Sequence, residues 1–301
     1  MLFQEFTSTG GHISEADTLT TSPHLITLSL FHSIWGVAST TAVSFHARGW
    51  RDLDDVVAHG WPTLTRVQQI GVKYHDELQQ GIPRAEVEAI AATVLTHAEG
   101  LRPGYRMMVV GGYRRGKEES GDVDVLLSHP DEEATRGFVG RLVVSLEGVG
   151  VVPHTLVLSE ANSERGQVAV SWKGEKKVAG TGFDTLDKAM VVWQAPGEEG
   201  QENPNPHRRV DIIISPWKTV GCAVLGWSGG TTFQRDLRRW CKKERGLKFD
   251  SSGVRSRKDG AWVDLESGND GSPAPDMLTA ERRVFERLGL VWRAPGERCT
   301  G

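Results

Sequence analysis

Two aspartates placed two residues apart carry the clearest chemical signal in the sequence. Asp122 and Asp124 stand in the segment DVDVLLS (122–128), in which polar and apolar residues alternate. Alternate side chains of a strand project from one face, so the two carboxylates lie on the same side, about 7 Å apart along the backbone. Such a pair is costly to desolvate without a cation, and its oxygens suit Mg²⁺ or Mn²⁺. The pair therefore predicts a divalent cation site, although a solvated acidic hairpin is the simpler alternative.

A glycine pair and several cations precede these aspartates. Gly112 lies ten residues before Asp122 and ends a Gly-Gly turn, and Arg114, Arg115 and Lys117 follow it. A glycine turn lets backbone N–H groups approach an anion closely. The segment GGYRRGKEESGDVDVLL (111–127) therefore predicts a phosphate cradle beside the cation site.

A third aspartate lies in the apolar segment RRVDIIIS (208–215). Asp211 shares a strand face with Arg209, whereas Val210 and its alternate neighbours face a core. A carboxylate in such an apolar strand needs a partner. Asp211 is accordingly either a third metal ligand that also activates an attacking hydroxyl, or the partner of Arg209 in an ion pair.

Two further segments have the composition of binding surfaces. Residues 235–248 hold seven Lys or Arg against two acidic residues, a local charge of +5, and Trp227 in the preceding LGWSGGTTF could stack on a sugar or base. The glycine turn within 34–41 joins two helices and could present backbone N–H groups to a phosphate. A solvated helix, a core tryptophan and a plain helical hairpin are the alternatives.

The elements that position these residues follow from periodicity and turn signals. Residues 28–80 indicate short helices, with Asp52 as an N-cap, and Pro83 begins a longer one. Further helices are predicted at 132–147 and 231–246, and Thr279 is expected to cap a last helix. The strand candidates are 107–112, 122–128, 154–159, 167–172, 188–194 and 208–215, with a loop at 195–207.

Composition limits the functional classes. The chain has 301 residues, 35 Lys and Arg against 39 Asp and Glu, and a net charge of −4, which argues mildly against a polyanion-binding protein. The three cysteines Cys222, Cys241 and Cys299 form no disulfide framework or metal knuckle. No apolar stretch is long enough for a membrane span, and the Thr-rich start is not a secretory signal.

Together these motifs resemble the family X DNA polymerases, most closely the branch of polymerase mu, terminal deoxynucleotidyltransferase and polymerase lambda. The likeness covers about residues 28–299, where RRVDIII, LGWSGGTTFQRDLRR and FERLGLVWRAPGER follow the 111–127 motif in the family's order. It implies an α+β fold, with a nucleotidyltransferase palm of mixed sheet and helices between a helix-hairpin-helix subdomain and a small C-terminal α+β subdomain. The corresponding parts are a flexible tail at 1–27, a helical DNA-binding part at 28–82, the palm at 83–218 and a nucleotide- and template-binding part at 219–301.

The resemblance also implies roles for individual residues. The metal and catalytic triad is Asp122, Asp124 and Asp211. The nucleotide site comprises Arg84, Gly112, Arg115, Gly121, Gly226, Trp227, Gly229 and Gln234. The DNA contacts are Ile34, Gly36, Val37, Arg209, Arg238, Lys242 and Lys243.

The implied reaction is DNA-directed addition of deoxynucleotides to a primer 3′-OH, supported by two Mg²⁺ or Mn²⁺ ions and by Na⁺ or K⁺ at the hairpin. The implied partners are primer–template DNA or DNA ends, deoxynucleoside triphosphates and end-joining factors, with no membrane. The implied setting is gap filling, base excision repair or non-homologous end joining in the nucleus.

Several positions depart from the family pattern. Ala38 replaces the second glycine of the hairpin. The pair Gly226–Trp227 resembles the mu and terminal-transferase branch, which implies weak discrimination against ribonucleotides. Gly121 stands where that branch places a histidine, and in this respect the chain resembles lambda and beta. Residues 173–185 are candidates for a loop that permits synthesis with little template, and no lyase or BRCT domain is recognisable. Another nucleotidyltransferase acting on RNA or a small molecule, and a catalytically silent DNA end-binding protein, are the rival interpretations.

Overall fold

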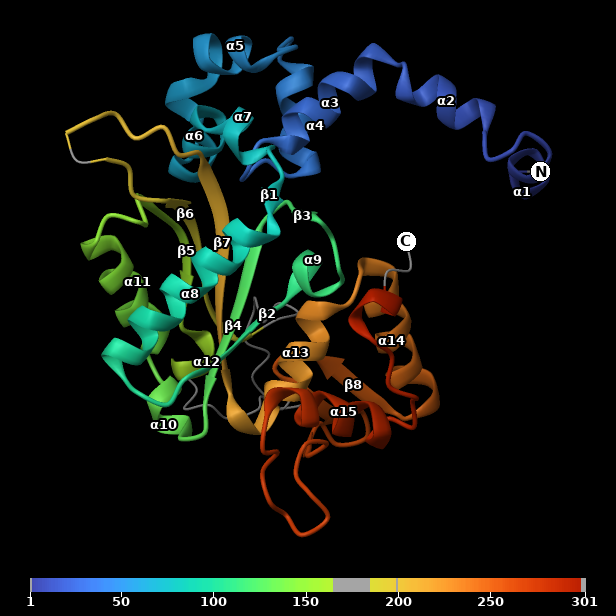
Figure 1. The fold of residues 1–301 in the computed structure, drawn as a ribbon. Coiled ribbons are helices and arrows are strands. Elements are labelled where there is room, and N and C mark those ends of the chain that lie inside the picture. The colour runs from blue at the N-terminus through green and yellow to red at the C-terminus, as the bar shows by residue number, and fades with distance from the viewer. Residues whose placement is uncertain (1, 165–184, 199, 299–301) are drawn as a thin grey trace. The chain divides into compact units, whose positions relative to one another are not determined.

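The computed structural model describes residues 2–164, 185–198 and 200–298 (Figure 1). The chain divides into two compact units, residues 1–80 and 81–301, which are described separately. The predicted strand at 167–172 lies outside the described residues, as does nearly all of the predicted loop at 173–185.

The first unit is helical. The short helices predicted over 28–80 are present, and two further helices, at Leu2–Ser8 and Ser14–Thr20, lie in the segment that was expected to be a tail. Its core contains Phe31 and Phe45, whose rings meet edge to face, and the N-cap role of Asp52 is confirmed because its side chain accepts the Asp55 N–H. A helix begins at Pro23, so the predicted start at residue 28 falls inside it. The elements are α1 (Leu2–Ser8), α2 (Ser14–Thr20), α3 (Pro23–Ser33), α4 (Ser39–Ala47), α5 (Leu53–Asp55), η1 (Val56–Gly60), η2 (Trp61–Thr63), α6 (Arg66–Lys73) and α7 (His75–Leu78).

The second unit is built on a mixed five-stranded sheet in the order β2-β4-β7-β6-β5. Among the described strands of this sheet, only β4 and β7 run parallel, and the other neighbours are antiparallel. The strands are β2 (Arg106–Val109), β4 (Val123–His129), β5 (His154–Ser159), β6 (Asp187–Gln194) and β7 (His207–Pro216), with a separate pair β1 (Ile82–Pro83) and β3 (Glu119–Ser120).

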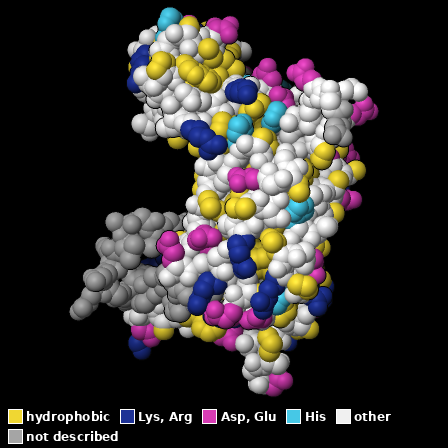
Figure 2. All heavy atoms as spheres, turned by 90° about the vertical axis from the view of Figure 1, so that its left-hand side faces the viewer, with side chains coloured by type: hydrophobic (Ala, Val, Ile, Leu, Met, Phe, Trp, Pro, Cys, Tyr) yellow, Lys and Arg dark blue, Asp and Glu magenta, His cyan; other side chains and the backbone are white. Residues whose placement is uncertain are grey.

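Helices cover both faces of this sheet (Figure 1). Apolar side chains of α8 (Arg84–Leu101) and α11 (Phe138–Gly148) pack on the face formed by Val125, Ile212 and their alternate neighbours. Leu126 and Ile213 face the other way, against α13 (Val220–Ser228) and α15 (Met277–Arg287). Figure 2 shows the side on which α11 lies, where charged side chains of both signs are interspersed with apolar ones. The predicted α+β class is confirmed.

The remaining elements include two corrections. The single helix predicted at 132–147 is broken into α10 (Glu132–Thr135) and α11, because Gly137 adopts the left-handed conformation. The last helix is capped by Asp276, whose side chain accepts from the Thr279 N–H and hydroxyl, and not by Thr279 itself. The other elements are α9 (Gly111–Arg114), α12 (Ala161–Glu164), η3 (Trp217–Thr219), α14 (Thr231–Glu244), η4 (Pro295–Arg298) and a three-stranded sheet of β8 (Leu247–Asp250), β9 (Gly253–Ser256) and β10 (Trp262–Val263).

Candidate active site

Three carboxylates meet on the sheet face that carries α13. Asp124 and Asp211 are register partners on the parallel strands β4 and β7, and Asp122 lies immediately before β4. One carboxylate oxygen from each lies within 4.8 Å of the others. Alternation in the two sequence segments predicts the face of each aspartate on its own strand, and the parallel pairing of β4 with β7 brings these faces together.

The electrostatics of this cluster favour binding a cation. Burial, together with the charges of Asp122 and Asp211, raises the pKa of Asp124 well above its usual value. Burial and the charge of Asp122 raise the pKa of Asp211 to about 6, against the opposing effects of Arg209 and Lys188. Asp211 Oδ1 is buried and has no hydrogen-bond partner among the described residues. The donor set therefore consists of carboxylate oxygens held close together with incomplete neutralisation, which suits Mg²⁺ or Mn²⁺.

Arg209, which the sequence offered as an ion-pair partner of Asp211, forms an ion pair with Asp122. Arg209 Nη2 lies 2.9 Å from Asp122 Oδ2, and both side chains are about one-third exposed. Arg209 was predicted as a DNA contact or as an ion-pair partner of Asp211. In the structure it holds the outermost carboxylate of the cluster, and the DNA role stays a prediction.

Gly111 joins the glycine turn to the carboxylate cluster. It has φ +60°, and an added Cβ atom would lie 1.8 Å from Asp124 Oδ2. No side chain larger than hydrogen fits there while Asp124 keeps its place. The sequence motif pointed to this turn, but Gly111 was not singled out as a site residue because the contact depends on how β2 and β4 pair.

The predicted phosphate loop follows Gly111. Gly112 lies in α9, where the nearest atom to an added Cβ would be in the Lys117 side chain, and Gly121 has open space around it. Arg115 Nη1 is 3.5 Å from the Ser228 carbonyl. Arg84 Nη1 donates to the Tyr113 and Lys117 carbonyls at 2.9 and 3.0 Å, so this arginine links two positions of the loop backbone. Its direct contact with a triphosphate stays a prediction.

The residues predicted to form a sugar and base pocket lie along α13 and at the start of α14. Trp227 is half-buried, with Lys188 Nζ 5.9 Å from the centre of its ring. A Cβ on Gly226 would lie 2.8 Å from Ser251 Cβ, so the β8–β9 turn approaches closely there. Gly229 packs against Phe233 and Gln234.

Gln234 is more enclosed than a pocket-lining residue would be. It is buried, and its amide donates to the Leu225 carbonyl at 2.7 Å, while its Oε1 has no hydrogen-bond partner in the part of the chain that the structure describes. Sequence reasoning missed Lys188, which approaches both Trp227 and the charge of Asp211. Its position on β6 gave no signal until the pairing of β6 with β7 was known.

Comparison with known proteins identifies the family. The DNA polymerase beta palm model matches residues 81–217, the fingers domain of DNA polymerase lambda matches 29–79, and the DNA polymerase beta thumb matches 223–299. The chain belongs to family X of the DNA polymerases. All three carboxylates lie within the palm match, and Trp227 and Gln234 lie within the thumb match.

Relatives in this family align over nearly the whole chain. DNA polymerase lambda of Rattus norvegicus is 31% identical over 96% of this chain, and that of Arabidopsis thaliana is 30% identical over 98%. The DNA-directed DNA/RNA polymerase mu of Homo sapiens is 28% identical over 96%. The chain spans 44%, 50% and 55% of the length of these three relatives.

The predicted DNA contacts of this family X chain lie in both units. Arg238 is half-buried on α14, whereas Lys242 and Lys243 are exposed near its end. In the hairpin between α3 and α4, the side chains of Ile34 and Val37 belong to the core, and the Val37 N–H donates to the Ile34 carbonyl. This N–H is therefore not available to a phosphate. The Gly36 carbonyl accepts from Gln68 Nε2.

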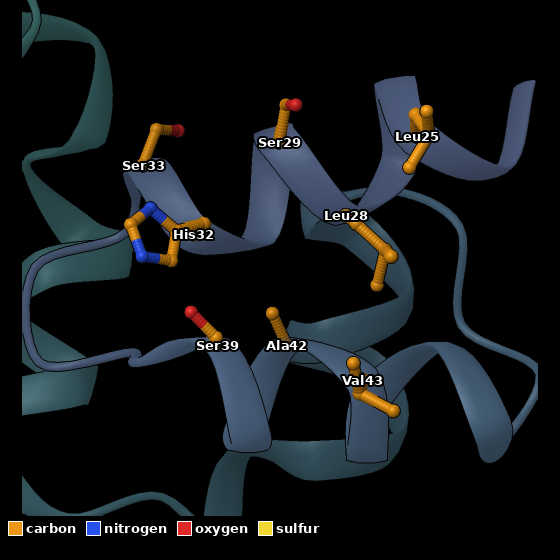
Figure 3. Close-up of a pocket in the computed structure, with 8 residues that line it drawn as sticks. All are labelled: Leu25, Leu28, Ser29, His32, Ser33, Ser39, Ala42 and Val43. Carbon is orange, nitrogen blue, oxygen red and sulfur yellow. The ribbon is translucent and has the colours of Figure 1, made fainter. Parts of the chain in front are cut away.

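A cavity of about 370 Å³ lies between the same two helices (Figure 3). Across it, His32 of α3 and Ser39 of α4 point toward one another. It is lined by Leu25, Leu28, Ser29, His32, Ser33, Ser39, Ala42 and Val43. These side chains include no carboxylate, Lys or Arg.

Proposed function

We propose that this chain is a DNA-directed DNA polymerase that adds deoxynucleotides to a primer 3′-OH. The observation that carries the proposal is the cluster of Asp122, Asp124 and Asp211, whose oxygens lie within 4.8 Å of one another. The match of the surrounding residues 81–217 to a polymerase palm supports it. The chain spans about half the length of the relatives that it matches.

The residues present fit two divalent cations. Asp211 Oδ1, which no described residue contacts through a hydrogen bond, is a buried acceptor of the kind that a metal ion satisfies. The three neighbouring carboxylates match the charge of such ions. Asp122, Asp124 and Asp211 would hold these ions through their carboxylate oxygens. When bound, Mg²⁺ or Mn²⁺ lowers the pKa of the attacking hydroxyl and stabilises charge on the transferring phosphoryl group.

The chain's own residues position the reactants. Asp211 accepts from the primer hydroxyl and orients it, and Arg209 keeps Asp122 turned toward the cluster. Arg115 and the backbone of the 111–117 loop neutralise and hold the triphosphate, with pyrophosphate as the leaving group. Trp227 and Gly226 face the nucleotide sugar, and the basic side chains of α14 hold the template strand.

Primer extension on gapped DNA with Mg²⁺ tests the proposal. We expect extension by the unaltered protein and a loss of at least a hundredfold in Asp211→Asn, which removes one negative charge without changing the side chain's size. Asp187→Asn is the matched control, since Asp187 is a buried aspartate of the neighbouring strand β6 that accepts only from Asn162 and Ser163 among the described contacts. Full activity of Asp211→Asn would refute the assignment.

We extend the proposal to repair synthesis in the nucleus, at gaps or joined DNA ends, because the relatives named above are polymerases of the lambda and mu type. The same assay, run with single-stranded and gapped DNA, with ribonucleotides and with RNA primers, separates the alternatives. End binding without incorporation under Mg²⁺ or Mn²⁺ would favour a silent end-binding protein. Extension confined to RNA would favour another nucleotidyltransferase.

A further inference from the structure

Tyr113, in the 111–117 loop that is proposed to bind phosphate, makes three contacts with side chains of α8. The Arg84 guanidinium carbon lies 3.8 Å from the centre of the Tyr113 ring, a stacked cation–π contact. The Tyr113 hydroxyl donates to Glu88 Oε1 at 2.7 Å. Arg84 also donates to the Tyr113 carbonyl at 2.9 Å. Ring, hydroxyl and backbone of one residue are therefore all held by α8.

The spacing on α8 explains how two side chains share one ring. Arg84 and Glu88 are four residues apart and lie one above the other on the same helix face. Arg84 supports the ring face, and Glu88 reaches the hydroxyl at the ring's far end. The hydrogen bond to Glu88 is the main reason that the pKa of Tyr113 is raised.

The held segment is the loop proposed to receive the triphosphate. Within it, the N–H of Gly116 donates to the Tyr113 carbonyl, and the N–H of Lys117 donates to the Gly112 carbonyl. Arg84 joins the two ends of this turn, because the same Nη1 also donates to the Lys117 carbonyl at 3.0 Å. A rotation of Tyr113 would therefore move the backbone that carries Gly112 and Arg115.

We propose that Tyr113, held by Arg84 and Glu88, is a positioning residue that fixes the 111–117 loop in the orientation needed to bind a nucleoside triphosphate. The inference rests on the proposed function, and it adds a residue that touches neither metal nor reacting atoms. Preorganised phosphate-binding groups gain affinity because the loop does not have to be ordered when the ligand arrives.

Steady-state kinetics with a single deoxynucleoside triphosphate on gapped DNA provide the test. Tyr113→Phe keeps the ring stacked on Arg84 and loses only the hydrogen bond to Glu88, so we expect KM to rise about fivefold with kcat within about twofold. Glu88→Ala should have the same effect, and the double variant should be no worse than either one. Glu88→Gln retains an acceptor oxygen and should remain close to the unaltered protein.

Tyr105→Phe is the matched control. Tyr105 is a buried tyrosine of the same unit whose hydroxyl donates to the Ala134 carbonyl, away from the loop. Loss of the Tyr105 hydroxyl should lower Tm without changing the KM for the nucleotide. An equal rise of KM in Tyr105→Phe, or an unchanged KM in Tyr113→Phe, would overturn the proposal.

Hydrogen exchange separates this proposal from the proposed function. The amides of Arg115, Gly116 and Lys117 should exchange several times faster in Tyr113→Phe than in the unaltered protein, with no change in Tyr105→Phe. This measurement needs no catalytic activity. Absence of primer extension by the unaltered protein would refute the polymerase assignment alone, whereas unchanged exchange of these amides would refute the positioning role of Tyr113.

Discussion

At the scale of single residues, the carboxylate cluster destabilises the fold that contains it. Asp124 and Asp211 are 9% and 7% exposed, and like charges surround them. Their ionised forms lose hydration on folding, and the charges of Arg209, Arg115 and Lys188 compensate for this loss only in part. The metal-free protein therefore carries a cost that a cation would remove.

Asp211 gives this cost a measurable pH dependence. Its pKa rises from 3.8 to about 6 on folding, so its contribution to stability is complete below pH 4 and is lost as the pH rises through 6. In EDTA at pH 7 we expect Asp211→Asn to be more stable than the unaltered protein by about 2–3 kcal/mol. Thermal unfolding from pH 4 to 8 measures the difference. A stability difference between the two proteins that stays constant with pH would contradict the explanation. Added Mn²⁺ should make this difference smaller.

At the scale of elements, a buried ionic network joins α9 to the C-terminal helix. Glu281 of α15 accepts from Arg114 at 2.8 Å and from Arg298 at 2.6 Å, and the Glu281 and Arg298 side chains are fully buried. Removing the carboxylate leaves two arginines without compensation in a dry site. We expect Glu281→Ala to lower the free energy of unfolding by about 3–5 kcal/mol.

Glu133→Ala is the control for this network, because the Arg136–Glu133 pair is exposed and should contribute less than about 1 kcal/mol. Urea unfolding of both variants checks the contrast. Similar losses in the two would mean that burial does not govern the strength of these pairs.

The start of α13 supplies a second titration. Glu266 accepts from the N–H groups of Gly221 and Cys222 at 2.7 and 2.9 Å, and burial raises its pKa to about 8. Its contribution to stability is complete below pH 4.5 and is lost toward pH 8. The stability of Glu266→Gln relative to the unaltered protein should therefore rise between pH 5 and 8, as measured by Tm. A fall in the relative stability of Glu266→Gln over this pH range would show that the two N–H donors lower the pKa of Glu266 more than burial raises it.

Sequence patterns predict elements better than the contacts between them. Strand alternation was enough to place Asp122 and Asp124 on one face of their strand, because parity decides the face on which each side chain lies. Their meeting with Asp211 depends on the parallel pairing of β4 with β7. The Arg209–Asp122 pair and the contact between Gly111 and Asp124 depend on strand pairing, which alternation does not specify. The break at Gly137 and the Asp276 cap were missed because a helical pattern continues through such positions without marking where the backbone turns.

At the scale of the whole molecule, net charge is a poor guide to what the surface binds. The chain has a net charge of −4, which mildly disfavours nucleic acid as a partner. Three of its acidic residues form the proposed metal site, and cations would neutralise them in use. The segment 235–248 carries +5, with Lys242 and Lys243 exposed near the end of α14. The local field along α14, which the average hides, should govern DNA binding.

Salt dependence tests this directly. Each phosphate contact releases counterions, so DNA affinity should fall steeply as salt rises despite the acidic average. The charge-reversed variant Lys242→Glu/Lys243→Glu should bind at least tenfold more weakly near 0.1 M salt, with a shallower slope of log affinity against log salt. Fluorescence anisotropy with gapped DNA measures both quantities.

Arg136→Glu/Arg141→Glu makes the same change of charge on the α10–α11 side of the sheet, where both side chains are exposed. That pair should leave affinity and slope nearly unchanged, because the opposite sheet face carries α13 and the carboxylate cluster. Equal losses in the two double variants would mean that overall charge, and not the field along α14, controls binding. Affinity indifferent to salt would count against DNA as the substrate.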